Sequence, residues 1–103
     1  MRTAPRHRPA EPAIQIARMI GMYGTCETIK LELNGEEIGR AVLYVKLGVG
    51  LVWDIGVADG DEERSVTLPL DRSKTNEEMW SAVELTLRLL ASPIVDKQQA
   101  RAA

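Results

Sequence analysis

Three successive runs rich in apolar residues lie between residues 28 and 57, and two glycine-containing turns separate them. In the first run, residues 28–33, every second side chain is Ile or Leu, and the others are Thr, Lys or Glu. This period of two is typical of a strand with one buried face. The Asn34-Gly35 pair that follows is the strongest short signal for a β-hairpin. The pattern therefore predicts a fold built around an antiparallel sheet.

The second and third runs, residues 38–47 and 51–57, flank the sequence Gly48-Val49-Gly50 and predict a second hairpin. If the loop has three residues, Leu47 lies opposite Leu51, and the apolar residues of both strands share one face. The other pairs expected on that face are Val45 with Trp53, Leu43 with Ile55, and Ala41 with Val57.

The first hairpin contains a conflict of register. A plain two-residue turn pairs Ile29 with Arg40, which puts the apolar face of one strand on the polar side of the next. A shift of one residue, through a three-residue loop or a bulge at Gly39, removes the conflict. The shifted pairs are Leu33 with Glu37 and Ile29 with Ala41. We therefore predict a bulge between Gly35 and Gly39.

A fourth strand follows the acidic loop of residues 59–63. Val66, Leu68 and Leu70 alternate with polar residues or proline and are expected to face inward. Pro69 has no N–H to donate to a neighbouring strand, so we expect this strand at an edge of the sheet.

An N-terminal helix is predicted over residues 13–23. Ile16, Met19, Ile20 and Tyr23 recur at the spacing of one helix face. Gly24 is suited to end such a helix in a left-handed conformation.

A C-terminal helix has a complete start signal. Thr75 is suited to be the N-cap, and Glu78 stands three residues later as its capping-box partner. The helix is expected to end by Ser92, because Pro93 follows.

These elements predict an α+β fold in the order αββββα, with a short N-terminal helix, a four-stranded antiparallel meander and a C-terminal amphipathic helix on one sheet face. The expected organisation is a flexible basic arm (1–12), one α+β domain (13–92) and a polar tail (93–103).

Over residues 13–92 the order of elements resembles the double-stranded-RNA-binding domain. In that family a basic turn begins the last helix, whereas here residues 75–78 read Thr-Asn-Glu-Glu. The resemblance therefore implies an architecture and no functional residue.

Charge and composition disfavour several classes of function. The chain has 13 basic and 15 acidic residues, a net charge of −2, which disfavours a general nucleic-acid coat. Charge is uneven: +3 over residues 1–24, −6 over 25–63 and +1 over 64–103. One His and one Cys do not suffice for a disulfide framework, and we expect no metal and no cofactor. Cys26 has only His7 as a possible base, so a structural thiol is the expected role.

Three surfaces are candidates for contact with a protein partner. The apolar arc of the last helix is wider than packing on one sheet requires, which leaves Leu85 and Leu89 in need of a second partner, with Trp80 at the other margin. The remaining candidates are an acidic loop and a polar patch on the outer sheet face. Their residues are Asp59, Asp61, Glu62 and Glu63 for the loop, and Arg40, Tyr44 and Asp54 for the patch.

The leading hypothesis is a small, non-enzymatic protein-interaction module that associates with itself or with a larger complex, in the manner of phage or mobile-element inhibitors and adaptors. The alternative is a nucleic-acid-binding accessory protein that uses Arg2, Arg6 and Arg8. A third possibility is an enzyme or small-ligand binder that uses the polar patch.

Nine Arg against four Lys, with eleven Ala, suggest a bacterial or phage source. With no apolar leader segment at residues 1–12, we expect a cytoplasmic location.

Overall fold

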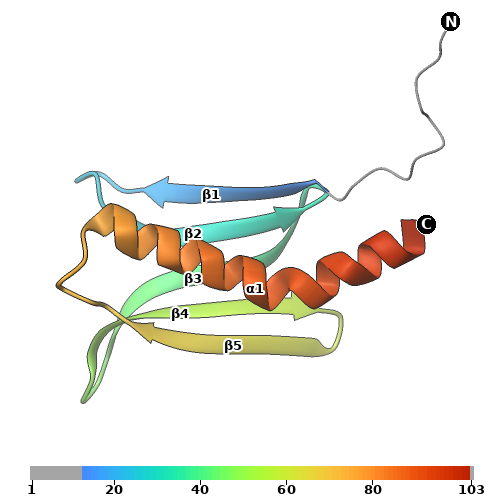
Figure 1. Ribbon diagram of the computed structural model, residues 1–103. Helices are drawn as coiled ribbons and strands as arrows, with labels where there is room; N and C mark the ends of the chain where they lie inside the picture. Colours follow the sequence, from blue (N-terminus) through green and yellow to red (C-terminus); the bar gives the residue numbers. More distant parts are fainter. Residues whose placement is uncertain (1–12, 103) are drawn as a thin grey trace, which may run out of the picture.

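The computed structural model describes residues 13–102 as one five-stranded antiparallel sheet with a single helix on one face (Figure 1). The strands follow one another in the order β1-β2-β3-β4-β5, so every neighbour in the sheet is also a neighbour in the chain. The elements are β1 (Ile14–Ile20), β2 (Cys26–Leu33), β3 (Glu36–Lys46), β4 (Gly50–Asp59), β5 (Glu62–Pro69) and α1 (Asn76–Ala102). The α+β class and the antiparallel meander are confirmed, with five strands instead of four.

The predicted N-terminal helix is wrong, because residues 14–20 form strand β1 at the sheet edge. Ile14 and Ile16 are half-buried against the core, whereas Met19, Ile20 and Tyr23 of the expected helix face are exposed. As a strand, the segment supplies hydrogen-bond partners for the backbone of β2, which an isolated helix cannot do. The likeness to the double-stranded-RNA-binding domain fails at this element.

The β2–β3 hairpin keeps the two-residue turn and still contains the predicted bulge. Asn34 and Gly35 have φ angles of 54° and 85°, as a type I′ turn requires. Leu33 therefore pairs with Glu36 and not with Glu37. The register shifts by one residue between Leu31 and Glu32, which leaves Ile38 as the extra residue on β3. Beyond this bulge Ile29 pairs with Ala41, as predicted.

The β3–β4 hairpin has its three-residue loop one position earlier than expected, at residues 47–49. Val49 donates a backbone hydrogen bond of 3.0 Å to the Lys46 carbonyl, and Gly48 adopts a φ of 83° inside this turn. Each predicted pair is displaced by two residues and stays on the same face. The observed pairs are Val45 with Leu51, Leu43 with Trp53, Ala41 with Ile55, and Gly39 with Val57.

The β4–β5 hairpin is tighter than the acidic loop expected over residues 59–63. Asp59 pairs with Glu62, so the turn consists of Gly60 and Asp61 only. The edge position of β5 is confirmed, with Pro69 as its last residue.

Helix α1 begins with the predicted capping box. The Thr75 N–H donates to Glu78 Oε1 at 2.8 Å, and the Glu78 N–H donates to Thr75 Oγ1 at 3.1 Å. The predicted end at Ser92 is wrong, because the helix passes through Pro93 and continues to Ala102. Ile94 is buried against the sheet, which favours continuation of the helix despite the proline. Figure 1 shows the axis of α1 bending toward its C-terminal end, as an internal proline produces.

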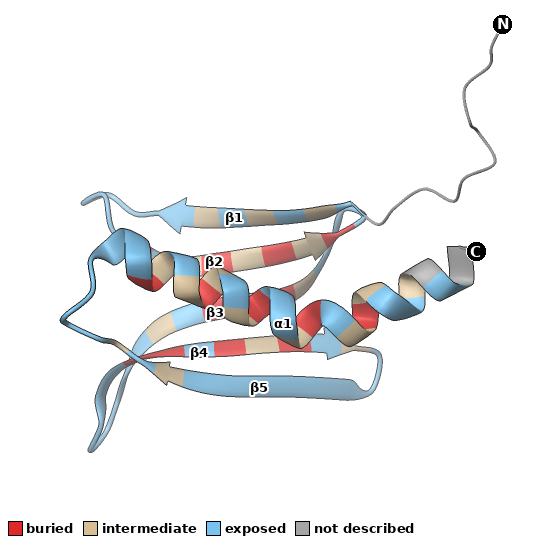
Figure 2. Ribbon diagram, in the orientation of Figure 1, coloured by how far each residue is buried: buried red, intermediate tan, exposed pale blue. Residues whose placement is uncertain are grey.

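The core lies between α1 and the central strands (Figure 2). Met79, Val83 and Leu87 of α1 pack on Trp53 and Ile55 of β4 and on the buried residues of β2. Gly39 of β3 lies under this contact, since a Cβ built there would stand 2.8 Å from Val57 Cγ1 and 3.3 Å from Leu87 Cδ2. Among residues 13–102, no helix covers the opposite face of the sheet (Figure 1).

Candidate interaction surface

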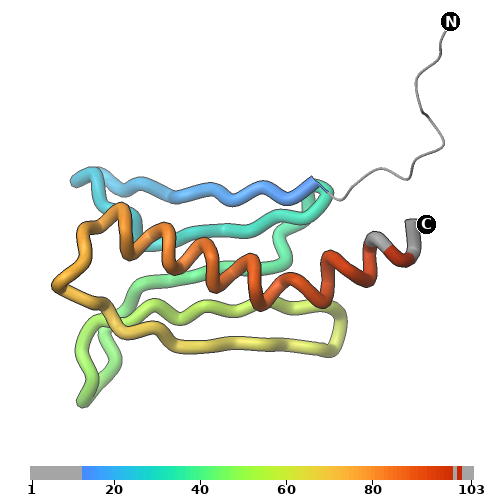
Figure 3. Tube along the Cα trace, viewed as in Figure 1, coloured from blue at the N-terminus to red at the C-terminus, as the bar shows by residue number. Residues whose placement is uncertain are grey.

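The β3–β4 hairpin extends beyond the strands on either side of it. The last residue of β3 that pairs with β2 is Val42, and the first residue of β4 that pairs with β5 is Val52. Residues 43–51, which we call the β-arm, therefore form a two-stranded ribbon that projects from the sheet (Figure 3). Along its side, the Leu70 N–H donates a backbone hydrogen bond of 3.1 Å to the Leu51 carbonyl.

The β-arm carries exposed apolar side chains on a surface with one charge, Lys46. Leu47 at the tip is 94% exposed, and Val45 and Val49 are 67% and 59% exposed. A two-stranded ribbon is at most marginally stable by itself, and burial of apolar side chains is the usual source of stability for a sheet. An apolar ribbon held in solvent is typical of a protein-interaction site or an aggregation-prone surface.

The β1–β2 turn lies at the same end of the sheet as the tip of the β-arm (Figure 1). Gly21 donates to the Thr25 carbonyl at 2.8 Å, and Gly24 donates to the Gly21 carbonyl at 3.0 Å. These two bonds hold a compact turn in which Met22 and Tyr23 are 92% and 88% exposed. One end of the molecule thus presents two ordered turns with apolar side chains.

Leu85 and Leu89 lie on α1 away from the core, as the width of the apolar arc predicted, and are 58% and 65% exposed. Trp80 is half-buried on the opposite flank of the helix, where the Arg18 guanidinium carbon lies 5.4 Å from the centre of the ring. Arg18 also binds Glu84 with Nε at 2.6 Å from Oε2, and its Nη1 lies 2.7 Å from Glu77 Oε2. Trp80 therefore contributes to the contact between β1 and α1.

The four carboxylates of the predicted acidic loop do not form one cluster. Asp59 Oδ2 accepts a hydrogen bond of 3.0 Å from Lys97 on α1. Glu62 and Glu63 are consecutive residues of β5, so their side chains leave opposite faces of the sheet. Within residues 13–102, no group of three His, Cys, Asp or Glu residues is arranged to hold a metal ion.

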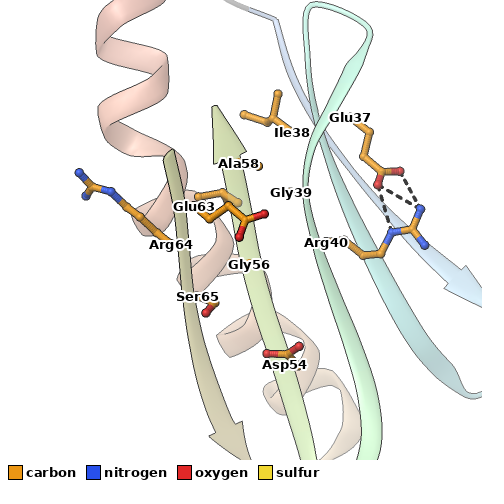
Figure 4. Close-up of a pocket in the computed structure, with 11 residues that line it drawn as sticks. Glu37, Ile38, Gly39, Arg40, Asp54, Gly56, Ala58, Glu63, Arg64 and Ser65 are labelled. Carbon is orange, nitrogen blue, oxygen red and sulfur yellow. Dashed lines mark hydrogen bonds and ion pairs between the residues drawn. The ribbon is translucent and has the colours of Figure 1, made fainter. Parts of the chain in front are cut away.

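The polar patch lies on the uncovered sheet face, around an open hollow of about 500 Å³ (Figure 4). Gly56 forms its floor because it has no side chain, and Asp54, Glu63 and Ser65 surround it. Arg40 is held by Glu37 through two hydrogen bonds of 3.1 and 3.0 Å, and this pair lowers the pKa of the Glu37 carboxyl. Arg40 is thereby bound to its own strand instead of being free for a ligand.

Tyr44 does not line this hollow. It lies farther along β3, within the β-arm, opposite Val52, and is 38% exposed. The structure thus divides the predicted polar patch into a charged hollow and an aromatic residue of the β-arm.

Cys26 is buried at the start of β2, where its thiol donates to the Thr28 carbonyl at 3.4 Å. Burial raises the pKa of this thiol, which keeps it neutral and a poor nucleophile.

The candidate nucleic-acid contacts Arg2, Arg6 and Arg8 lie outside the described residues. No helix in the described part of the chain has the length and hydropathy needed to cross a membrane.

The β-arm was not among the surfaces predicted from the sequence, because its apolar residues were assigned to the core face. A signal was present: residues 43–51 contain a single charge and place two glycines in a turn flanked by apolar residues. Without the lengths of the neighbouring strands, that pattern does not distinguish a buried hairpin from a projecting one.

No protein-family model, curated protein or solved structure matches this chain.

Proposed function

We propose that this protein is a small interaction module, without catalytic function, that binds another protein through the β-arm. The observation that carries the proposal is the projection of residues 43–51 beyond β2 and β5 with Val45, Leu47 and Val49 exposed. Docking on a larger protein, as an adaptor or an inhibitor does, is the role that such an arm suits.

The shape of the β-arm supports a protein partner more than a small molecule. Small ligands bind in concave sites that bury most of their surface, whereas the β-arm is convex. A projecting apolar ribbon fits into a groove on a partner, and burial of its side chains provides the free energy of binding. Met22 and Tyr23 at the same end extend the contact area, and Tyr is a residue type enriched in such interfaces.

The exposed pair on α1 is the competing surface. Leu85 and Leu89 are two side chains on a long helix, and polar or charged neighbours such as Ser81, Arg88 and Ser92 surround them. Scattered apolar side chains of this kind are normal on protein surfaces. The β-arm is the larger continuous apolar feature and is therefore the preferred binding site.

The test is site-specific photo-cross-linking in cells of the native host. A photoreactive amino acid replaces Leu47 at the tip of the β-arm, and the matched control places it at Thr67 on β5. We expect a discrete adduct with one protein from position 47 and none from position 67, as measured by mass spectrometry. Adding Val45→Thr and Val49→Thr to the same chain should abolish the adduct, because both changes keep strand propensity and remove apolar surface.

A second double variant, Leu85→Gln with Leu89→Gln, separates the two surfaces. The adduct from position 47 should survive it. If position 47 yields no adduct, if position 67 yields the same adduct, or if only the helix variant removes it, the β-arm is not the binding site.

A further inference from the structure

Strand β1 forms an edge of the sheet, and no strand among residues 13–102 pairs with its outer side. Ala13 accepts a hydrogen bond of 2.8 Å from the Asn34 N–H, and its own N–H donates to Asn34 Oδ1 at 2.9 Å. Backbone groups alternate in direction along an antiparallel strand, so Gln15 and Ala17 also point toward β2. The N–H and C=O groups of Ile14, Ile16 and Arg18 therefore point away from the sheet.

The two edges of the sheet differ in their protection against pairing. β5 begins with three charged residues, Glu62, Glu63 and Arg64, and ends at Pro69, and both features discourage the addition of a strand. β1 has the sequence Ile-Gln-Ile-Ala-Arg-Met-Ile, without proline and with one charge. That charge is neutralised inside the molecule, because Arg18 is bound by Glu77 and Glu84 of α1. The edge at β1 is therefore the one that can accept a further strand, and a segment that pairs with it must be extended.

A second copy of β1 fits this edge. When two β1 strands run antiparallel about a two-fold axis at Ala17, all seven residues overlap, from Ile14 opposite Ile20 to Ile20 opposite Ile14. The outward groups of Ile16 then meet those of Arg18 in the other copy, which forms a hydrogen-bonded pair on each side of the axis. Residues that oppose each other lie on the same face in this register, so the core faces of the two sheets stay continuous.

Ala17 occupies the position where the two copies approach most closely. It is exposed on the uncovered sheet face and would stand opposite itself in a pair without hydrogen bonds, where Cα atoms are about 4.5 Å apart. Alanine is the smallest side chain of β1, so the two copies of residue 17 can stand opposite each other without a steric clash. Met19 and Ile20, 48% and 55% exposed in the monomer, gain Gln15 and Ile14 of the second copy as cross-strand neighbours.

We propose that the protein forms a two-fold symmetric homodimer in which the β1 strands of two copies pair antiparallel and join their sheets into one of ten strands. This surface is separate from the β-arm, so the dimer presents two β-arms to partners. Two linked arms raise the avidity for a partner with repeated sites.

The experiment measures molar mass by light scattering after gel filtration, at protein concentrations from about 1 µM to 1 mM, the range of weak to moderate association. We expect the mass to rise toward twice the monomer mass of 11.4 kDa. Ala17→Lys and Ala17→Glu each place like charges opposite each other across the axis, which should weaken dimerisation at least about tenfold. An equal mixture of the two variants should restore it, because opposite charges then face each other.

Thr67→Lys on the other edge strand is the matched control and should dimerise as the wild type does. The double change Val45→Thr with Val49→Thr should also leave the dimer intact, which keeps the test separate from that of the β-arm. A mass of one monomer at every concentration would overturn the proposal. Wild-type dimerisation by the separate Ala17 variants, or loss of the dimer in the β-arm variant, would place the contact elsewhere and equally overturn it.

Discussion

Gly39 is the residue at which the spacing between helix and sheet is set. A Cβ at this position would lie 2.8 Å from Val57 Cγ1, 3.2 Å from the Gly56 carbonyl oxygen and 3.3 Å from Leu87 Cδ2. Its φ is not in the left-handed region, so conformational freedom is not the reason for glycine here. The absent side chain lets Leu87 of α1 reach the floor of the core.

Gly39→Ala is expected to destabilise the protein by about 1–3 kcal/mol, the usual cost of overpacking a core. Gly56→Ala is the matched control on the neighbouring strand, since a Cβ there meets its closest atoms at 3.6 Å. It should be neutral or stabilise by about 0.5 kcal/mol, because Ala loses less chain entropy than Gly. Urea denaturation measures both free energies. Equal stabilities for the two variants would show that Gly39 does not set the helix–sheet distance.

Arg18 is a second residue whose role depends on partners that are distant in the sequence. It bridges β1 to Glu77 and Glu84, which lie 59 and 66 residues further along the chain. Its guanidinium also lies over Trp80. In the sequence it is only one of nine arginines, and its local pattern gives no sign of these contacts.

At the scale of elements, α1 is longer than its local signals predict. Proline inside a helix costs about 3 kcal/mol in an isolated context. Beyond Pro93, Ile94 is 8% exposed, and Lys97 binds Asp59 at the end of β4. Contacts with the sheet thus offset the cost of the proline.

Ile94→Ala tests whether this last part of α1 belongs to the core. We expect a loss of about 2–3 kcal/mol, toward the lower end for Ile→Ala changes because Ile94 lies at the end of the core. Asp96→Ala, an exposed change on the same segment, should stay within about 0.5 kcal/mol of the wild type. Thermal or urea unfolding monitored by circular dichroism measures both. If Ile94→Ala had no effect, the helix would end near Ser92 in solution.

Strand β1 shows why one element was assigned wrongly. Residues 14–23 satisfy two periods, because Ile14 and Ile16 are two apart while Ile16, Met19, Ile20 and Tyr23 follow a helix face. The choice between them is made by β2, whose backbone would otherwise remain unpaired on one side. That is a tertiary effect, and local spacing does not contain it.

For the whole molecule, paired carboxylates link stability to pH. Hydrogen bonds from Arg40 lower the pKa of Glu37, those from Arg18 lower the pKa of Glu77, and those from Thr75 lower the pKa of Glu78. A carboxyl group whose pKa is lower in the folded state stabilises the fold above its ordinary pKa of 4.5. This contribution is lost as the pH falls through the folded-state value.

The free energy of unfolding should therefore decrease as the pH is lowered from about 6 to about 3. Glu77→Gln removes one of these carboxyl groups, so the variant should lose less stability than the wild type over the same interval. Glu63→Gln, which changes a carboxyl group outside the three pairs, is the control and should retain the wild-type slope. Urea denaturation at each pH measures the effect, and equal slopes for all three proteins would contradict it.

The single helix is narrower than the sheet on which it packs. Five strands about 4.8 Å apart span about 19 Å, whereas one helix is about 10 Å wide. Helix α1 therefore covers the central strands and reaches β1 through Arg18, while within residues 13–102 no other element covers the opposite sheet face, the outer side of β1 or the β-arm. The edge of β1 is available because β1 is the first strand of an open sheet, and the β-arm projects because β3 and β4 extend beyond β2 and β5.

The sequence by itself determined the two hairpins that join β2, β3 and β4, the bulge between Gly35 and Gly39, the edge position of β5 with its Pro69, and the capping box at Thr75. Each depends on residues close together in the chain, where turn chemistry and side-chain alternation act directly. Only the tertiary structure decided that residues 14–20 are a strand, that α1 continues past Pro93 and that the β-arm projects into solvent. Those outcomes depend on the relative lengths of neighbouring strands and on burial against distant residues, because these contacts outweigh local preference.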